Sequence, residues 1–383
     1  MTSKTQTPDL SVPRWWIPVV ALGTGAGCIS ALQPILLGLL SGAGKLGVSE
    51  MGAAATAEAA GMALATTLAA FFLPLRRLRL IAFGALTAML LANAGTVLAS
   101  GAAIVALRLF SGCGGGILLW ILLGMFTRRP APARLFAIFV TAQSIVGLVL
   151  SQAMTAAIVP LLGYAGGYIV LCGMNLLLLL AVWLMPNSMG GRETGILGLP
   201  QLLPCLAIVA IGCHLAGILA VWVYILPLLK ELGYPASAVA LAVPVTIAGQ
   251  IAGGIAATIL ATRLAPLTAW IFGLVVIAAS ILALTLSTNT LAMLTAVAVI
   301  GFLWIFVPPF HMPVLLNLDS SGRGAMLIGT AQLSGTSLGP LVAAAMVSNQ
   351  SVRAVIGIGL VFLAASLVLL AIASRSRAVP LPA

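Results

Sequence analysis

Charged side chains are scarce in this sequence, and acidic ones are the scarcest. Only 6% of the 383 residues are charged, and Asp and Glu together number six. A soluble globular protein carries about 25% charged residues. The composition therefore excludes a soluble fold of this size, and the few acids argue against a carboxylate-built metal site.

The sequence also lacks the motifs of most enzymes and metal proteins. Its five cysteines all fall inside apolar runs and none has C-x-x-C spacing, which argues against disulfides and a zinc site. It contains no P-loop, G-x-S-x-G or H-E-x-x-H motif. We therefore expect neither an enzyme nor an ATP-driven pump, and no cofactor or metal.

A net charge of +11 does not indicate a nucleic-acid partner here. The basic residues lie in short gaps between apolar runs, and no basic stripe with interleaved aromatic residues occurs. The partners that we expect are a lipid bilayer, protons and a small-molecule substrate, with the chain as a monomer.

Long apolar runs dominate the chain, 62% of which is hydrophobic. Runs of about 20 apolar residues are typical of membrane-spanning helices, whereas barrel strands alternate over about 10 residues. The first run lacks a convincing cleavage site, so we expect a retained span. The pattern predicts twelve spans, at 15–40, 49–73, 78–98, 101–126, 134–159, 163–185, 202–228, 236–260, 266–287, 290–312, 325–347 and 352–374.

The basic residues predict the orientation of these spans. With an even number of spans both termini lie on one side, and that side collects Lys4, Arg14, Arg76, Arg77, Arg79, Arg128, Arg129, Arg134, Arg192, Arg263, Arg323, Arg375 and Arg377. The other side has only Lys45, Lys230 and Arg353. Because cytoplasmic loops are enriched in Lys and Arg, we expect both termini in the cytoplasm, in a bacterial inner membrane.

The chain divides near its middle into two halves that resemble each other. The longest connection, 186–200, separates a six-helix half at 1–185 from another at 201–383. The word TAQ occurs at 141–143 and at 330–332, and the same offset carries Gly112 onto Gly301. Two parallel repeats with a central substrate site are the plan of one class of transporters.

Three ionisable residues lie at mid-depth in the predicted spans, namely Glu58, Arg108 and His214. Such groups cost several kcal/mol in lipid unless they are paired or hydrated, and they mark functional sites by default. Glu58 and Arg108 each lie about nine residues into spans that run in the same direction. Since a helix rises roughly 1.5 Å per residue, we expect both at about the same depth in the bilayer. They predict either a fixed ion pair or a proton-exchanging site. His214 is a transport residue or a hydrogen-bonded core histidine, and we expect His311 at the membrane interface.

Neutral polar and aromatic residues predict the rest of a cavity. The candidates for substrate binding, beside Arg108 and His214, are Gln33, Gln143, Trp222, Tyr224, Gln250, Trp304 and Gln332. Each ionisable candidate has a glycine one turn later, Gly61, Gly112 and Gly217 respectively, which predicts close helix packing.

The segment IVALRLFSGCGGG at 104–116 resembles the span-4 signature of the major facilitator superfamily. Arg108 and Gly112 match its arginine and glycine, Gly114 and Gly116 suit its small positions, and Ser111 replaces its usual glutamine. The resemblance implies twelve transmembrane helices in two pseudo-symmetric halves. In proton-coupled exporters of that family this arginine takes part in proton transfer, a role that the resemblance gives to Arg108.

Other segments resemble the same family in part. GTSLGPLVAA at 335–344 is similar to the G-x-x-x-G-P motif of antiporters through Gly335, Gly339 and Pro340, although the family carries it in span 5. LPLRRLRL matches the family's basic loop only in its arginines, and LDSSGRGA at 318–325 resembles a loop of some efflux members. The resemblance implies helix-packing and gating roles for Gly335, Gly339 and Pro340.

The sequence thus predicts a secondary transporter of a small organic molecule, with proton-coupled export by alternating access. Proton-coupled uptake of an organic anion is the first alternative. A non-transporting membrane sensor or scaffold is the second, although such a protein would normally carry a sizeable soluble domain.

Overall fold

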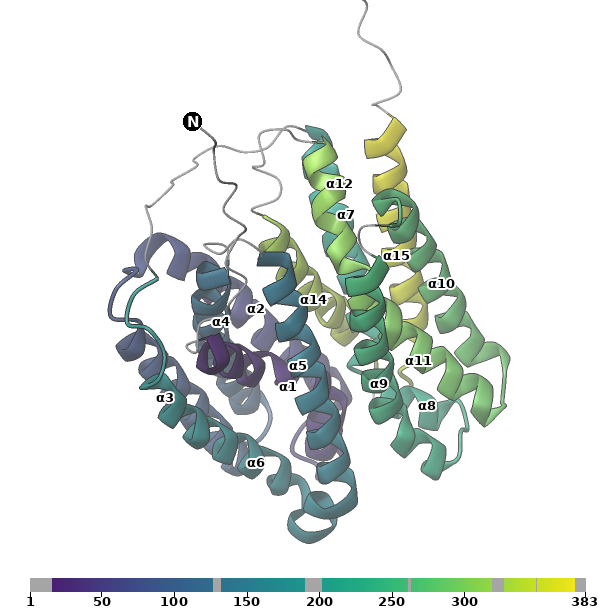
Figure 1. The fold of residues 1–383 in the computed structure, drawn as a ribbon. Coiled ribbons are helices and arrows are strands. Elements are labelled where there is room, and N and C mark those ends of the chain that lie inside the picture. Colours follow the sequence, from purple (N-terminus) through teal and green to yellow (C-terminus); the bar gives the residue numbers. More distant parts are fainter. Residues whose placement is uncertain are drawn as a thin grey trace, which may run out of the picture.

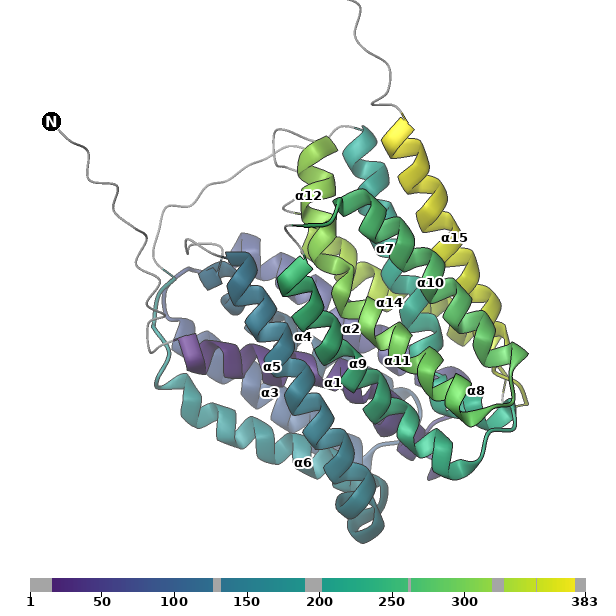
Figure 2. The same ribbon diagram turned by 45° about the vertical axis from the view of Figure 1, so that its right-hand side comes forward.

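The computed structural model describes residues 16–126, 132–189, 202–260, 263–318, 327–348 and 350–375. Within them the chain is helical, apart from connections and one isolated β-bridge between Arg76 and Ser188. Figures 1 and 2 show the helices as one bundle, with the N-terminal helices on one side and the C-terminal helices on the other.

The first group of helices comprises α1 (Trp16–Gly42), α2 (Val48–Phe72), α3 (Leu78–Leu98), α4 (Ala102–Phe126), α5 (Pro132–Ala153), the π-helical turn η1 (Met154–Ile158) and α6 (Val159–Val182). The second comprises α7 (Leu202–Trp222), α8 (Ile225–Glu231), α9 (Ala236–Leu260), α10 (Pro266–Leu286), α11 (Thr290–Phe306), α12 (Pro308–Leu318), α14 (Ile328–Met346) and α15 (Ala354–Arg375). Each of the twelve apolar runs is therefore helical over most of its length in the described residues.

Three of these runs differ in detail from the prediction. The seventh ends at Trp222 and restarts as α8, because Pro227 cannot donate a hydrogen bond to the preceding turn. The tenth bends by 41° between α11 and α12, where Pro308 and Pro309 break it. The fifth continues through η1 into α6 and reverses near Gly163, whose φ of 61° favours glycine (Figure 1).

The described residues include eight helices that are long and apolar enough to cross a membrane, or nine if the bent pair α11 and α12 is one span. This is fewer than the twelve expected. The stretch Ile138–Val182 counts once although it reverses, and neither α2 nor α14 is among the eight. Both of these helices carry polar residues and glycines on faces that other helices cover.

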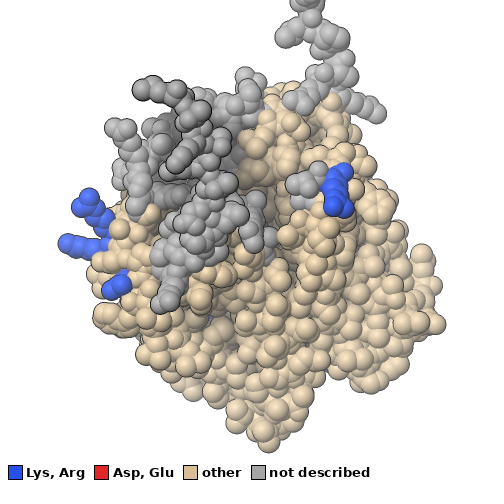
Figure 3. Space-filling model, viewed as in Figure 1, with Lys and Arg blue, Asp and Glu red and all other residues tan. Residues whose placement is uncertain are grey.

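The surface suits a lipid environment. Large apolar side chains lie exposed around the bundle, including Leu98 at 86%, Leu161 at 80% and Phe110 at 60% exposure. Soluble monomers rarely expose apolar patches on this scale. In Figure 3, basic side chains of the described surface appear at the left edge near mid-height and at the upper right, and the lower part of this face shows no charged side chain. The structure is that of a helical protein suited to a membrane.

The helices of each group pack in the same order of neighbours. In the first group α2 and α3 pack on α4, α3 on α6, and α1 on α5 and α6. In the second, α9 and α10 pack on α11, α10 on α15, and α7 on α14 and α15. The groups meet where α2 packs on α14 and α5 on α9.

Hydrogen bonds between connections define two ends of the bundle. At the Lys45 end, the amide of Gly101 donates to the carbonyl of Lys45 at 2.8 Å. At the Arg76 end, which contains the α2–α3 connection, the amide of Leu78 donates to the carbonyl of Asn187 at 3.1 Å. The first contact joins the α1–α2 and α3–α4 connections, and the second joins the start of α3 to the segment that follows α6.

Candidate functional site

Arg108 lies about two turns into α4 and is 1% exposed. Its Nη2 donates to three oxygens of α3, which are Asn93 Oδ1 at 2.9 Å, Thr96 Oγ1 at 2.8 Å and the carbonyl of Ala92 at 3.3 Å. The face of the Tyr168 ring, from α6, lies 5.1 Å from the guanidinium carbon. Such a contact adds cation–π attraction where water is excluded. Two neighbouring helices, α3 and α6, therefore hold the guanidinium of α4.

Glu58 of α2 completes this site. Its carboxylate oxygen lies 3.4 Å from Arg108 Nη1, and the residue is 3% exposed. Gln33 of α1 and Ser111 of α4 lie beside the carboxylate. The two predicted residues therefore form a buried ion pair, whose attraction offsets part of the cost of removing both groups from water.

Two glycines bring α2 and α4 close enough for this pair. A β-carbon on Gly112 would overlap the carbonyl oxygen of Glu58, and one on Gly61 would overlap the carbonyl oxygen of Leu109. Small residues allow helix backbones to approach in lipid. The predicted packing role of both glycines thus corresponds to a contact that aligns Glu58 with Arg108.

Sequence reasoning did not single out Asn93, Thr96 or Tyr168. The signal was available for the first two, because polar residues three apart in an apolar run share one helix face. The depth of Arg108 was visible in the sequence, but the helix that faces it was not.

The second polar cluster lies among the C-terminal helices. His214 of α7 and His311 of α12 are both 0% exposed, and His214 Nδ1 lies 3.3 Å from His311 Nε2. His311 Nδ1 lies 3.4 Å from Gln332 Nε2 of α14. The Trp270 ring of α10 packs 4.4 Å from the His311 ring, centroid to centroid. Four helices meet at this cluster.

The expected interfacial position of His311 is wrong. The bend after α11 turns α12 against α7, so that His311 lies in the interior beside His214. A residue near the end of a predicted span reads as interfacial only if the span is straight, and the prolines at 308 and 309 bend this one.

The remaining predicted substrate residues lie apart from both clusters. Trp222 Nε1 donates to the carbonyl of Ser30 on α1 at 3.0 Å, and its ring packs 5.5 Å from that of Trp304. Gln143 Nε2 donates to the carbonyl of Gly27 at 3.0 Å. Tyr224 and Gln250 are buried. Of the neutral substrate candidates, Gln33 lies beside Glu58 and Gln332 lies beside His311.

The other predicted packing residues all lie at helix contacts. Gly114 faces α3, Gly217 faces Gly359 of α15, and Gly335 and Gly339 face α7. The carbonyl oxygen of Pro340 on α14 lies against Gly52 of α2, which belongs to the first group of helices.

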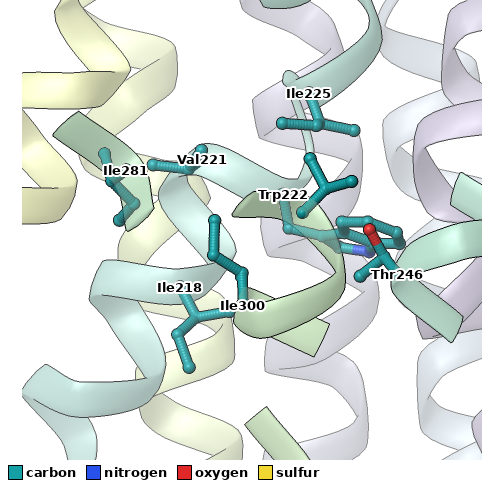
Figure 4. A pocket seen from close by; sticks show the side chains of 8 residues that line it. Ile218, Val221, Trp222, Ile225, Thr246, Ile281 and Ile300 are labelled. Atoms are coloured by element: carbon teal, nitrogen blue, oxygen red, sulfur yellow. The ribbon is translucent and has the colours of Figure 1, made fainter. Parts of the chain in front are cut away.

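A small apolar pocket lies among the C-terminal helices (Figure 4). It is lined by Ile218, Val221, Trp222, Ile225, Thr246, Ile281, Val297 and Ile300. Its lining residues come from α7, α8, α9, α10 and α11. The hydroxyl of Thr246 donates to the carbonyl of Ala242 in its own helix, so the pocket offers little polar chemistry.

Part of this pocket lies where α9 crosses α11. That crossing matches the crossing of α2 and α4 in the first group, where Glu58 contacts Arg108. A β-carbon on Gly301 would overlap the carbonyl oxygen of Thr246, as one on Gly112 would overlap that of Glu58. Thr246 thus takes the place of Glu58. Counting back from Gly301 as from Gly112, Val297 takes the place of Arg108. One group carries an ion pair where the other carries an apolar pocket.

Among the described residues no group of three or more His, Cys, Asp or Glu side chains could hold a metal ion. No model of a known protein family matches the chain, and no curated protein matches it. The site must therefore be interpreted from its own geometry.

Proposed function

We propose that this chain is a secondary active transporter of a small organic molecule, and that it exports its substrate in exchange for protons. Two six-helix halves, α1 to α6 and α7 to α15, would rock about a central site. The resemblance of 104–116 to the major facilitator superfamily agrees with this proposal. The single observation that carries it is the buried pair of Glu58 and Arg108, since intramembrane ion pairs mark ion and substrate pathways.

The order of helix neighbours supports the proposed halves. The pairings of the first group recur in the second, down to the glycine crossings at Gly112 and Gly301. The contacts between the groups pair α2 with α14 and α5 with α9. Under the same repeat α2 corresponds to α9 and α5 to α14, so the two contacts are equivalent. Such an arrangement is what a pseudo-two-fold axis along the membrane normal would produce.

The buried apolar residues support alternating access. Toward the Lys45 end, residues of α1 and α2 such as Leu36, Leu40 and Met51 belong to one cluster with the C-terminal helices. Toward the Arg76 end, residues such as Val19, Leu86 and Leu122 form a cluster of their own. Halves that share a core at one end and have separate cores at the other suit a transporter closed toward the first end.

Contacts along α2 relate the ion pair to the interface between the halves. Thr56 donates its hydroxyl to the carbonyl of Ser337 on α14 at 3.2 Å, and Ser337 donates back to the carbonyl of Thr56. Glu58 follows two residues later and faces α4. In the proposed mechanism, a proton on Glu58 removes its attraction to Arg108, loosens α2 from α4 and thereby shifts α2 against α14.

A neutral Glu58 would leave Arg108 as a buried cation held by neutral α3 groups, ready for an anionic or polar part of the substrate. The buried guanidinium also favours the second candidate function, uptake of an organic anion together with protons. The two differ in outcome, because an exporter lowers the cellular accumulation of its substrate and an importer supports growth on it.

The test begins with a thermal-shift screen of the purified protein against metabolites and drugs at two pH values, since a ligand of the native state raises its melting temperature. The ligand found is then assayed in proteoliposomes with an imposed pH gradient. We expect Glu58→Gln to exchange substrate without response to the gradient. Transport by Glu58→Gln that still follows the gradient would refute the role of Glu58.

The basic residues support an orientation with the Arg76 end in the cytoplasm, in a bacterial inner membrane. The termini and the connections at 127–131, 190–201 and 319–326 contribute to that prediction but lie outside the described residues.

A further inference from the structure

The chain contains two histidines, and the fold brings both to one buried place. His214 and His311 are 97 residues apart in sequence, yet their rings lie 5.4 Å apart at an angle of 80°. Neither is exposed. A buried neutral imidazole requires hydrogen-bond partners. The contact between the two rings therefore determines which of their nitrogens carry protons.

A hydrogen bond between two imidazole nitrogens needs one proton between them. His214 Nδ1 and His311 Nε2, 3.3 Å apart, therefore have one N–H and one bare nitrogen in the neutral pair. The side chain of Gln332 continues the chain at His311 Nδ1, and either its oxygen or its nitrogen suits whichever tautomer is present. At the other end His214 Nε2 has no partner among the described residues.

In the part of the chain that the structure describes, the helices around the pair provide no counter-ion for a charged imidazole. On the described parts of α7, α10, α11, α12, α14 and α15, the only titratable side chains besides the two histidines are the thiols of Cys205 and Cys213. Among the described residues, the charged side chains next to these helices lie beyond their ends: Arg263 precedes α10, Arg353 precedes α15, and Lys230 and Glu231 lie in α8 after α7. Arg375 ends α15, and its side chain lies outside the described part.

One feature stabilises an added proton, and two others restrict the pair to a single shared charge. The Trp270 ring lies 4.4 Å from the His311 ring and 6.5 Å from the His214 ring, so its π-electrons attract an imidazolium. His311 also lies in the first turns of α12, where the positive end of the helix dipole disfavours a charge on His311 alone. A second proton would place like charges 3.3 Å apart.

We propose that His214 and His311 together form a proton-binding site that takes up one proton for the pair. Gln332 and Trp270 are its positioning residues. This inference rests on the proposed proton-coupled transport and adds to it a coupling site in the C-terminal half, separate from Glu58. Since a buried charge without a counter-ion costs several kcal/mol, uptake of the proton favours an arrangement in which α12 moves from α7 at the bend after α11.

The test uses full-length protein labelled with ¹⁵N only in histidine, in lipid nanodiscs. With two histidines in the chain, the spectrum holds only these two rings. At neutral pH we expect a scalar coupling across the hydrogen bond between His214 Nδ1 and His311 Nε2. As the pH falls, both rings should change in one step that binds one proton. Two independent steps, or no change down to the pH of unfolding, would overturn the proposal.

Variants separate this site from Glu58. In His311→Gln the remaining ring of His214 should lose the coupling and titrate by itself. The control Trp183→Phe, at the exposed end of α6, should leave the one-proton step unchanged. In proteoliposomes, the response to a pH gradient should fall at least tenfold in His214→Gln and in His311→Gln. His311→Gln should keep substrate exchange. A full response in both variants would overturn the coupling role.

The outcomes for the two proposals are distinguishable. The wild type could show the one-proton step and yet transport no substrate. In that case the proposed function fails and the proton site stands. If the wild type transports with protons and the spectrum shows no shared proton, the proton site fails and the proposed function stands.

Discussion

The carboxylate of Glu58 lies 3.4 Å from the guanidinium of Arg108, at a crossing where α2 and α4 touch through Gly61 and Gly112. The pair is buried, whereas Glu231 and Arg353 form a pair with a 3.1 Å contact in which the arginine side chain is 61% exposed. These two pairs in one chain allow matched comparisons.

We predict that Arg108→Met lowers the stability of the purified protein by about 3–5 kcal/mol, because it leaves Glu58 buried and unpaired. Glu58→Gln should cost less, since three α3 oxygens still accept from Arg108. Denaturation in detergent measures both, with Arg353→Gln as the exposed control at below about 1 kcal/mol. Equal losses for Arg108→Met and Arg353→Gln would show that the buried pair does not stabilise the bundle.

The same variant has a pH dependence of known sign. In Arg108→Met the unpaired carboxyl of Glu58 can take up a proton, and a buried neutral acid costs far less than a buried carboxylate. The loss of stability should therefore shrink as the pH falls. The wild type at each pH serves as the reference, and a loss that grows toward acid pH would contradict the burial of Glu58.

A methyl group at the α2–α4 crossing should separate the helices. We predict that Gly112→Ala lowers the melting temperature by several degrees and weakens proton coupling, since the added carbon overlaps the carbonyl of Glu58. Gly84→Ala on α3 is the matched control, because nothing lies within 4 Å of its added carbon and alanine favours a helix. A harmless Gly112→Ala would mean that α2 and α4 are not held this closely.

Locking α2 to α14 should stop transport if the two halves rock. The hydroxyl of Ser49 donates to the carbonyl of Ala344 at 2.7 Å across this interface. In a background without native cysteines, Ser49→Cys with Ala344→Cys should cross-link, block transport and recover on reduction. Glu231→Cys with Ser351→Cys, a pair within the C-terminal half, is the control that should keep transport. Full activity of the cross-linked α2–α14 pair would contradict alternating access.

The orientation is testable by labelling from one side. A membrane-impermeant maleimide added to intact cells should modify Lys45→Cys and Arg353→Cys, but not Arg76→Cys or Arg263→Cys. Disruption of the membrane should make all four reactive. Labelling in the reverse order would place the Arg76 end outside and contradict the positive-inside prediction.

Much of the helix content followed from the sequence because it depends on local chemistry. Helices such as Leu78–Leu98 and Ala236–Leu260 end where their apolar runs end, since an apolar backbone segment in lipid must satisfy its own hydrogen bonds. The breaks at Pro227 and Pro308 were readable in principle, but their geometry was not, because a proline shows where a helix is interrupted and not the direction of its continuation.

The sequence by itself determined a membrane-suited helical chain with one mid-depth acid, one mid-depth arginine and few other charges. Only the tertiary structure decided which groups meet. It joined Arg108 to Glu58 and to α3 and α6, and it moved His311 from an expected interface to a buried contact with His214. The physical reason is that periodicity and composition report the environment of each helix, whereas pairing between helices depends on glycine crossings and bends.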